Sequence, residues 1–423
     1  MRLLLFVLVL LLAGLPASAE TLVVRPDGTG PFPMIQAAID AAVNGDVVEL
    51  TDGTFTGDGN RDLDFLGKSI SLGSASGNPA TCILDCAGSE TEPHRAFYIH
   101  GGGPEGTEVS GITITGGYVY FESYNAIVLC EGPCTCAFRA CVFSANQGGV
   151  LVSDNNCVVT MVDCIFQGNS GFRGAIHCGG TTLTLTRCHF SGNSGNYDAG
   201  AVDACESIGT IRECSFSGNS GDTTGAVRFF FSTSVALEDC LFEDNVASSH
   251  GALQILYSDV TIEGCTFVRN TSDWMGGALW TDKMARVHLR DCTFWGNGSL
   301  RGTMVLGQIE TTLENCIIAA STAGPAIRVA GTVELSCCDL WGNPGGDWVG
   351  GIEGQYGIRG NISEDPQFCD APSGDYTLAE TSPCAPFSPP NPECDLIGAW
   401  PVACGGTPVD LSSWGEIKAR FRR

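Results

Sequence analysis

A column of chemically varied side chains recurs at a fixed distance from a glycine in five consecutive segments. Each segment contains Gly-Ala followed by Ile, Val or Leu, and the next residue belongs to the column. The five residues are His177, Asp203, Arg228, Gln254 and Trp280. A carboxylate or an imidazole can act as a base, and a guanidinium can stabilise a developing anion. The amide and the indole suit the binding of an extended sugar chain.

The direction in which this column faces determines whether it can meet a ligand. The apolar residue before each member is expected to point inward, so strand alternation predicts that the column itself faces solvent. Neighbouring members then lie about 5 Å apart, and the column spans about 20 Å. We predict candidate catalytic residues at Asp203, Arg228 and His177, and candidate substrate-binding residues at Gln254 and Trp280. The alternative is an ordinary outer surface, because outward positions vary freely and are usually polar.

A second candidate site is the acidic stretch over residues 58–64, Asp-Gly-Asn-Arg-Asp-Leu-Asp, which resembles the start of a calcium loop. The stretch departs from the EF-hand pattern at its sixth position, Leu63, and at its twelfth, Ser69, where a glycine and a bidentate glutamate belong. One prediction is therefore a Ca²⁺ site, and the other is a solvated loop without a cofactor. The four candidate ligands are Asp58, Asn60, Asp62 and Asp64.

The elements that carry the five-residue column follow from an internal repeat. The unit Cys-x-Phe-x-x-Asn occurs seven times, and two degenerate copies follow. The cysteines of these nine units are Cys141, Cys164, Cys188, Cys214, Cys240, Cys265, Cys292, Cys316 and Cys338. Between them come the Gly-Ala corner and a short alternating stretch such as Leu183-Thr184-Leu185. Each period of about 25 residues therefore holds three short extended pieces.

Three short strands cannot bury themselves alone, so consecutive periods must stack. Stacking gives three parallel sheets around one narrow core, with equivalent residues about 4.8 Å apart. We therefore predict an all-β fold, a right-handed parallel β-helix solenoid with an N-terminal capping helix. Phenylalanine is expected to stack on phenylalanine inside, and asparagine to bond to the next asparagine at a turn. The inward cysteine column is expected to hold mostly free thiols, with disulfides between coils as the alternative.

The ends of the chain differ from the repeat. Residues 1–19 have the basic start, apolar run and Ala-x-Ala site of a signal peptide, which predicts export to the medium or the cell surface. The solenoid is expected over 20–404, with a capping helix at about 34–43, regular repeats at about 125–345 and a closing cap at about 360–404. Ile35, Ile39 and Val43 fall on one helix face that can cover the first coil. Residues 405–423 are expected to be a linker and a short tail, either docked on the last coil or used for sorting.

Charge and cysteine content limit the possible partners. The net charge of −26 repels phosphate backbones and excludes nucleic-acid binding. No later apolar run is long enough for a transmembrane span, and we expect a monomer. The 22 cysteines contain no CxxC pair at zinc spacing, and the cluster at Cys130, Cys134 and Cys136 is too crowded for one. In the loop-rich closing cap, where crosslinks contribute most, we predict oxidation of Cys369, Cys384, Cys394 and Cys404.

Three stretches resemble known families. The segment from Asp27 to Phe55, with Ile-Gln-Ala-Ala-Ile-Asp-Ala-Ala at 35–42, resembles the N-terminal cap of the pectate lyase/pectinesterase-like right-handed β-helix superfamily. The F-x-x-N and G-G-A-[ILV] repeats are similar to the polymorphic outer-membrane proteins of chlamydiae. The segment from Glu364 to Ala399 resembles the C-terminal end of bacterial β-helix repeat proteins. The resemblance covers residues 22 to about 400 and implies the fold, whereas the superfamily contains lyases, esterases, hydrolases, epimerases and non-enzymes.

The catalytic patterns of the enzymes in this superfamily are missing from the sequence. These patterns are G-x-x-D-F-I-F-G and L-G-R-P-W of pectinesterases, the N-T-D, D-D, G-H-G and R-I-K set of polygalacturonases, and D-P-H-E of alginate epimerases. We therefore predict a secreted or cell-surface protein that binds a polysaccharide, a cell-surface glycan or another surface partner without catalysis. The alternative is a polysaccharide lyase or glycoside hydrolase acting on an extended glycan along one sheet face. A purely structural envelope protein is a third possibility.

Overall fold

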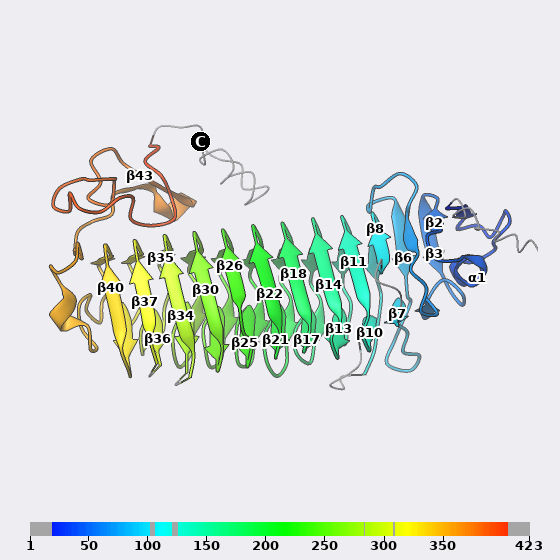
Figure 1. The fold of residues 1–423 in the computed structure, drawn as a ribbon, viewed down its shortest axis with the longest axis horizontal. Helices are drawn as coiled ribbons and strands as arrows, with labels where there is room; N and C mark the ends of the chain where they lie inside the picture. Colours follow the sequence, from blue (N-terminus) through cyan, green and yellow to red (C-terminus); the bar gives the residue numbers. More distant parts are fainter. Residues whose placement is uncertain (1–18, 102–105, 121–125, 283, 308, 405–423) are drawn as a thin grey trace, which may run out of the picture.

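The computed structural model describes residues 19–101, 106–120, 126–282, 284–307 and 309–404, which form one elongated solenoid (Figure 1). About 12 parallel turns follow one another from the blue N-terminal end to the yellow coils, where the closing cap begins. The all-β parallel solenoid predicted from the repeat is confirmed. All but the last residue of the predicted signal peptide, and the predicted tail at 405–423, lie outside the described residues.

Sheet A is formed by the strand that precedes each cysteine of the repeat. Alternation places every second side chain in the core, as for Leu183 and Leu185 of β18. The 13 strands of sheet A in the described chain are β1 (Thr21–Val24), β2 (Val47–Leu50), β5 (Ser71–Ser74), β8 (Thr107–Ser110), β11 (Thr135–Arg139), β14 (Val158–Val162), β18 (Thr182–Thr186), β22 (Ile208–Arg212), β26 (Val235–Glu238), β30 (Asp259–Glu263), β34 (Arg286–Arg290), β37 (Thr311–Glu314) and β40 (Val333–Ser336).

Sheet B contains the phenylalanine of each repeat as the central residue of a short strand. A left-handed residue directly before each cysteine turns the chain from sheet A into sheet B, as Asp239 does at φ 54°. Its 12 described strands are β3 (Gly53–Thr56), β6 (Cys82–Asp85), β9 (Thr113–Thr115), β12 (Val142–Ser144), β15 (Ile165–Gln167), β19 (His189–Ser191), β23 (Ser215–Ser217), β27 (Leu241–Glu243), β31 (Thr266–Val268), β35 (Thr293–Trp295), β38 (Ile317–Ala319) and β41 (Asp339–Trp341).

Sheet C follows the Gly-Ala corner and carries the five-residue column. The corner is tight, since a Cβ added at Gly200 would collide with the carbonyl oxygen of Gly225 in the next coil. Its 11 described strands are β4 (Leu63–Asp64), β7 (Phe97–His100), β10 (Val128–Glu131), β13 (Leu151–Asp154), β17 (Ile176–Gly179), β21 (Val202–Cys205), β25 (Val227–Phe230), β29 (Leu253–Leu256), β33 (Leu279–Thr281), β36 (Met304–Leu306) and β39 (Ile327–Val329).

A fourth sheet, sheet D, was not predicted from the sequence. It consists of two-residue strands that follow the repeat asparagine, and the chain then loops back over sheet C. Its five described strands are β16 (Ser170–Gly171), β20 (Ser194–Gly195), β24 (Ser220–Gly221), β28 (Val246–Ala247) and β32 (Thr271–Ser272). The sequence signal that we overlooked is Asn-Ser-Gly at 169–171, 193–195 and 219–221.

The core consists of stacked columns of identical residues. The phenylalanine rings lie almost parallel, and the centroid of Phe216 is 4.9 Å from that of Phe190 and 4.8 Å from that of Phe242. The asparagines form the expected ladder, in which Nδ2 of Asn219 donates to Oδ1 of Asn245 at 3.0 Å. The nine cysteines of the repeat are buried and unbridged, so the prediction of free thiols is confirmed.

The N-terminal end is covered by α1 (Ile35–Ala41), the predicted capping helix. Ile35 and Ile39 are buried, but Val43 is 58% exposed because the helix ends before it. The assignment of Val43 to the buried face was therefore wrong. The backbone N–H of Ile35 donates to Oδ1 of Asn60 at 3.0 Å, which satisfies one free donor at the helix start.

The closing cap contains η1 (Glu353–Gln355), β42 (Phe368–Asp370), η2 (Ala371–Ser373) and β43 (Asp375–Leu378). It folds back onto the coils of sheet B, where the backbone N–H of Ala399 donates to Oγ1 of Thr293 at 2.9 Å and the indole N–H of Trp400 donates to Oγ1 of Thr266 at 3.1 Å. Figure 1 shows this orange and red segment beside the flank of the solenoid.

Two disulfides hold the closing cap, Cys337–Cys394 and Cys369–Cys404. Three of the four predicted cysteines are therefore oxidised. The prediction for Cys384 was wrong, because this residue is a buried thiol that donates to Oδ2 of Asp339 at 3.2 Å. Cys337 takes its place in the crosslinks, since it occupies the left-handed turn before Cys338, at φ 50°, and bonds to the cap.

Candidate functional site

The five-residue column is aligned as predicted. In sheet C, His177 pairs with Asp203, Asp203 with Arg228, Arg228 with Gln254, and Gln254 with Trp280. Parallel pairing therefore brings together the side chains that the spacing placed in one column. The candidates for chemistry are neighbours in space although about 25 residues separate each pair along the chain.

The predicted exposure of this column was wrong. His177, Asp203 and Gln254 are 5%, 0% and 2% exposed, and only Arg228 and Trp280 are half-buried. The cause is the chain between sheet D and the Gly-Ala corner, which folds over sheet C. Side chains of these covering loops contact the column; they are Arg173, Asp198, Thr224 and His250.

The first three members of the column form a buried charged network with two loop residues. Oδ2 of Asp203 is 2.9 Å from Nδ1 of His177, and Oδ1 accepts from Nε of Arg228 at 2.7 Å. Nη1 of Arg228 also lies 2.6 Å from Oδ1 of Asp198. Nη1 of Arg173 lies 3.1 Å from Nε2 of His177 and can only donate. This contact makes Nε2 of His177 the acceptor from Arg173 and directs Nδ1–H at Asp203.

The two carboxylates of the network differ in their electrostatics. Burial acts to raise the pKa of Asp203, but the hydrogen bond from His177 and the charge of Arg228 outweigh it, so the pKa lies below its usual value. Burial and the neighbouring charge of Asp203 raise the pKa of Asp198. Asp203 is therefore an ionised group at the centre of the network, whereas Asp198 lies at its edge.

The described residues contain one group of three side chains with the spacing of metal ligands. Ligand atoms of His177, Asp203 and Cys205 all lie within 4.8 Å of one another. The chemistry of the group does not fit a metal ion. Both carboxylate oxygens of Asp203 are already engaged, Oδ2 by Nδ1 of His177 and Oδ1 by Nε of Arg228. The guanidinium of Arg228, which bonds to Asp203, would also repel a cation.

The four candidate calcium ligands each bond to the protein. Asp58 pairs with Arg61 at 3.0 Å, Asn60 accepts from the start of α1, Asp62 contacts His94 at 2.6 Å, and Asp64 contacts His100 at 2.9 Å. In the described part of the chain, the three aspartates do not belong to a group of three ligand atoms that all lie within 4.8 Å of one another. Calcium binding at this loop stays a prediction from the sequence.

The last two members of the column, Gln254 and Trp280, are uncharged. Thr224 donates to Oε1 of Gln254 at 2.9 Å, and Nε2 of Gln254 lies 2.9 Å from Nδ1 of His250. The His250 ring lies 4.0 Å from the Trp280 ring. Burial lowers the pKa of His250 to about 4, so the imidazole is neutral at pH 7. Gln254 and Trp280 thus support the covering loops from below.

Two adjoining hollows lie on the loops above this column. The first, of about 460 Å³, is lined by Tyr197, Asp198, Asp222, Thr223, Arg228, Ser248 and Ser249. The second, of about 310 Å³, shares Asp222 and Ser248 with the first and is otherwise lined by small residues, with Asp273 at its edge. Tyr197 is 56% exposed and stacks on Phe172 at 4.9 Å. Apart from Arg228, the groups that line the hollows belong to the loops, and sequence analysis of the column missed them.

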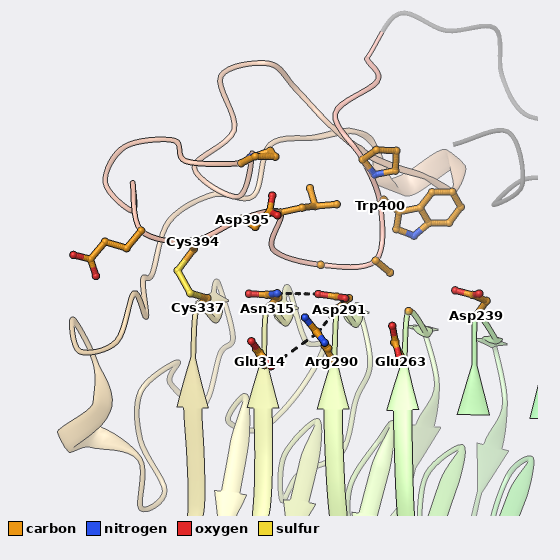
Figure 2. Close-up of a pocket in the computed structure, with 17 residues that line it drawn as sticks. Asp239, Glu263, Arg290, Asp291, Glu314, Asn315, Cys337, Cys394, Asp395 and Trp400 are labelled. Atoms are coloured by element: carbon orange, nitrogen blue, oxygen red, sulfur yellow. Dashed lines mark hydrogen bonds and ion pairs between the residues drawn. A yellow bond between two sulfur atoms is a disulfide. The ribbon is translucent and has the colours of Figure 1, made fainter. Parts of the chain in front are cut away.

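A larger groove of about 670 Å³ separates the closing cap from the coils (Figure 2). Figure 2 shows Asp239, Glu263, Asp291 and Glu314 in a row at the ends of the sheet A strands, on the side of Asp395 and Trp400 of the cap. Arg290 lies among these carboxylates, and Asn315 donates to Asp291 at 2.9 Å. Trp400 is only 4% exposed, so this groove lacks the accessible aromatic ring that the loops over sheet C present.

Among the described residues, no helix is both long enough and apolar enough to span a membrane. Comparison with curated proteins found no match. Two solved structures show distant likeness to the chain. The catalytic unit of a thermostable GH87 α-1,3-glucanase from Streptomyces thermodiastaticus has 14% identity and a TM-score of 0.47, over 84% of this chain and 70% of that one. The PL6 family alginate lyase AlyGC has 12% identity and a TM-score of 0.45, over 89% and 57%.

A family model described as "Right handed beta helix region" matches residues 176–303 and 202–363. The matched residues include β17 to β41, the coils that carry the column and its covering loops. The parallel pairing of sheets A, B and C agrees with that description. The match and the stacked sheets together identify the protein as a right-handed parallel β-helix.

Proposed function

We propose that this protein binds extended neutral glycans, without cleaving them, on the loops that cover sheet C. The observation that carries the proposal is the exposed ring of Tyr197 beside the two adjoining hollows. An accessible aromatic ring packs against the apolar face of a sugar, and nearby polar groups bond to its hydroxyls. Asp222, Ser248 and Ser249 supply a carboxylate and two hydroxyl groups at the same hollow.

The arrangement of the hollows suits an extended ligand. Their lining residues come from successive coils, and consecutive strands of sheet D, such as β24 and β28, pair in register. Equivalent positions therefore repeat about every 4.8 Å along the solenoid. A chain molecule laid along this direction meets a similar set of polar groups at each coil.

The charges favour a neutral glycan over an acidic one. Arg228 is the one cation among the described residues that line the two hollows, and its nitrogens contact Asp203, Asp198 and Cys205. The exposed charged groups at the hollows are the carboxylates of Asp222 and Asp273. A uronic acid would meet these negative charges without an available guanidinium, which disfavours its binding.

Binding without cleavage is favoured by the state of the predicted catalytic residues. Asp203 and His177 are buried and bonded to each other. Asp198 has the raised pKa of a general acid, but Oδ1 lies 2.6 Å from Arg228 and Oδ2 lies 3.5 Å from Arg173. A carboxyl held by two guanidinium groups is poorly placed to deliver a proton to a leaving group.

Affinity electrophoresis against neutral and acidic polysaccharides tests the proposal. We expect retardation by at least one neutral polysaccharide, none by alginate or polygalacturonate, and no new reducing or unsaturated ends. Tyr197→Ala should weaken binding by about tenfold, or 1.4 kcal/mol. The matched control is Tyr257→Ala, since Tyr257 is 44% exposed but stacks on Phe231, away from the hollows. Cleavage products would instead support a lyase or hydrolase, and equal effects of the two variants would remove the assigned surface.

The predicted location outside the cytoplasm remains a proposal. Two disulfides in the closing cap support it, because such bonds persist in oxidising compartments. Fractionation of the producing cells, followed by immunodetection in medium, envelope and cytoplasm, tests this location. Recovery of the protein only from the cytoplasm would contradict it.

A further inference from the structure

A set of cysteines outside the repeat column lies where the regular coils begin. Cys130 is the last buried residue of β10, and Cys136 is the second residue of β11. Cys134 directly precedes β11, and Cys157 directly precedes β14. The four side chains are at most 4% exposed. Sulfur atoms of two pairs lie within 3.5 Å of each other, Cys134 with Cys157 and Cys130 with Cys136, and Cys134 also lies near Cys130 and Cys136.

The two pairs differ in geometry. Cys134 and Cys157 stand directly before Thr135 and Val158, which pair in register between β11 and β14. They are therefore equivalent positions on consecutive coils, at the Cα separation of about 5 Å that a disulfide accepts. Their sulfur atoms are 2.7 Å apart, whereas those of Cys130 and Cys136 are 3.5 Å apart.

We infer that Cys134 and Cys157 form a disulfide that links two consecutive coils. A sulfur separation of 2.7 Å approaches the bond length of about 2.05 Å, and closing it needs only a small side-chain adjustment. The Cys130–Cys136 pair lies within one coil, at an ordinary contact distance, and stays reduced.

A shared metal ion is a poorer account of this cluster. In the described residues, the group of three with the spacing of metal ligands is His177, Asp203 and Cys205, and it includes none of these four cysteines. Sulfur ligands of a tetrahedral zinc site, at about 2.3 Å from the ion, lie near 3.7 Å from one another. The 2.7 Å separation of Cys134 and Cys157 is too short for two such ligands.

The bond forms by exchange with an external disulfide, such as oxidised glutathione or an oxidised thiol–disulfide oxidoreductase. The thiolate of one cysteine attacks the external disulfide and releases one thiol. The second cysteine then attacks the mixed disulfide and releases the other thiol, so the two cysteines lose two electrons and two protons in total. Because both positions are buried in the finished coil, exchange precedes the closure of that coil.

The consequence is a crosslink within the solenoid body. The two residues are 23 positions apart, about one period, so the bond ties one complete coil to the next. The linked segment contains β13, which pairs with β17, the strand that carries His177. Unlike the two bonds of the closing cap, this one holds the stacking of coils at the start of the regular repeats.

Peptide mapping of the full-length chain tests the inference. The protein is produced by an exporting host, denatured, alkylated without reductant and digested. We expect a linked peptide pair containing Cys134 and Cys157, together with the two cap crosslinks, and alkylated Cys130 and Cys136. Alkylation of both Cys134 and Cys157 in a sample whose cap disulfides are intact would overturn the inference, as would a Cys130–Cys136 crosslink in place of Cys134–Cys157.

Thermal melting of paired variants gives a second readout. Cys134→Ala with Cys157→Ala, and the matched pair Cys130→Ala with Cys136→Ala, remove the same number of buried sulfur atoms. Without reductant, the first pair should lower Tm by more than the second, because it also removes a crosslink. When every variant is unfolded and refolded in reductant, which opens all the crosslinks while the chain is unfolded, the two losses should become similar. Equal losses under both conditions would contradict the crosslink.

Discussion

The phenylalanine column inside the solenoid and the five-residue column of sheet C are aligned by the same parallel pairing, but their side chains make different contacts. Phe216 stacks between identical rings in the coils before and after it. Asp203 contacts two different side chains of its own column, His177 and Arg228, and Arg228 in turn contacts Asp198 of a covering loop. Stacking alone therefore defines the inner column, whereas the outer column depends on the chain that covers it.

The largest expected effect comes from breaking the inner column. Phe216→Ala should lower the free energy of unfolding by about 3–5 kcal/mol, because it removes a fully buried ring from between two others. Phe242→Ala should behave in the same way. Chemical denaturation followed by circular dichroism measures both losses. A loss below about 1 kcal/mol would show that the ring column is not a core element.

Breaking the outer column should cost nearly as much. Asp203→Ala leaves His177 without its carboxylate partner and Arg228 with Asp198 alone in a buried site, for which we expect a loss of about 3 kcal/mol. The control is Asp222→Ala on the exposed loop, which should change stability by less than about 0.5 kcal/mol. The solvent-facing position that we predicted for Asp203 from the sequence would have implied no such loss. Equal stability of the two variants would contradict the expected loss.

The carboxyl of Asp339 is buried, and among the described residues it has no cation partner. It accepts from the Cys384 thiol and from the backbone N–H of Glu364, and burial raises its pKa to about 7. The folded chain therefore holds the proton more tightly than the unfolded chain, and stability falls as pH rises from about 4 to about 7. The rise from 3.8 corresponds to at most about 4 kcal/mol.

The contribution of Asp203 to the pH dependence of stability has the opposite sign, because its lowered pKa makes stability fall as pH drops below about 4. Asp339→Asn should flatten the stability profile between pH 4 and pH 7, and Asp203→Asn should leave that interval unchanged. Denaturation at a series of pH values measures both profiles. An unaltered slope in Asp339→Asn would contradict the assignment of this carboxyl.

A smaller loss is expected at the asparagine ladder. Asn219 bonds to Asn245, to the backbone carbonyl of Phe190 and, through Oδ1, to Asn193. Asn219→Ala removes these bonds but no large apolar volume, so the loss should be about 1–3 kcal/mol. Chemical denaturation of Asn219→Ala and Phe216→Ala under the same conditions ranks the stability losses from the two columns. A larger loss for Asn219→Ala would reverse the ranking of ring stacking over hydrogen bonding.

Most features that repeat with identical residues were predicted from the sequence, and sheet D, marked by Asn-Ser-Gly, is the exception. The three sheets, the Phe216 and Asn219 columns, the free thiols of the repeat and the helix at Ile35 all follow from periodicity, alternation and end effects. Each of these features is decided by neighbours of the same type or by simple apolar patterning.

The sequence did not predict the features that depend on irregular segments. Exposure of Asp203 is decided by loops of variable length after sheet D, and no periodic signal marks where Asp198 returns over the sheet. The pairing of Cys337 with Cys394 depends on how the closing cap folds back, which sequence spacing does not define. The accessible residue Tyr197 lies in such a segment and was therefore missed.

In our proposal, the network beneath the loops supports a glycan-binding surface formed by the loops themselves. Unfolding and binding, both measured for Asp203→Asn and Tyr197→Ala, test this proposal. Tyr197→Ala should keep its unfolding free energy within about 0.5 kcal/mol and bind about tenfold more weakly. Asp203→Asn should lose stability but still bind at a temperature where it is folded. A stable Asp203→Asn that no longer binds, together with a Tyr197→Ala that binds normally, would contradict the account.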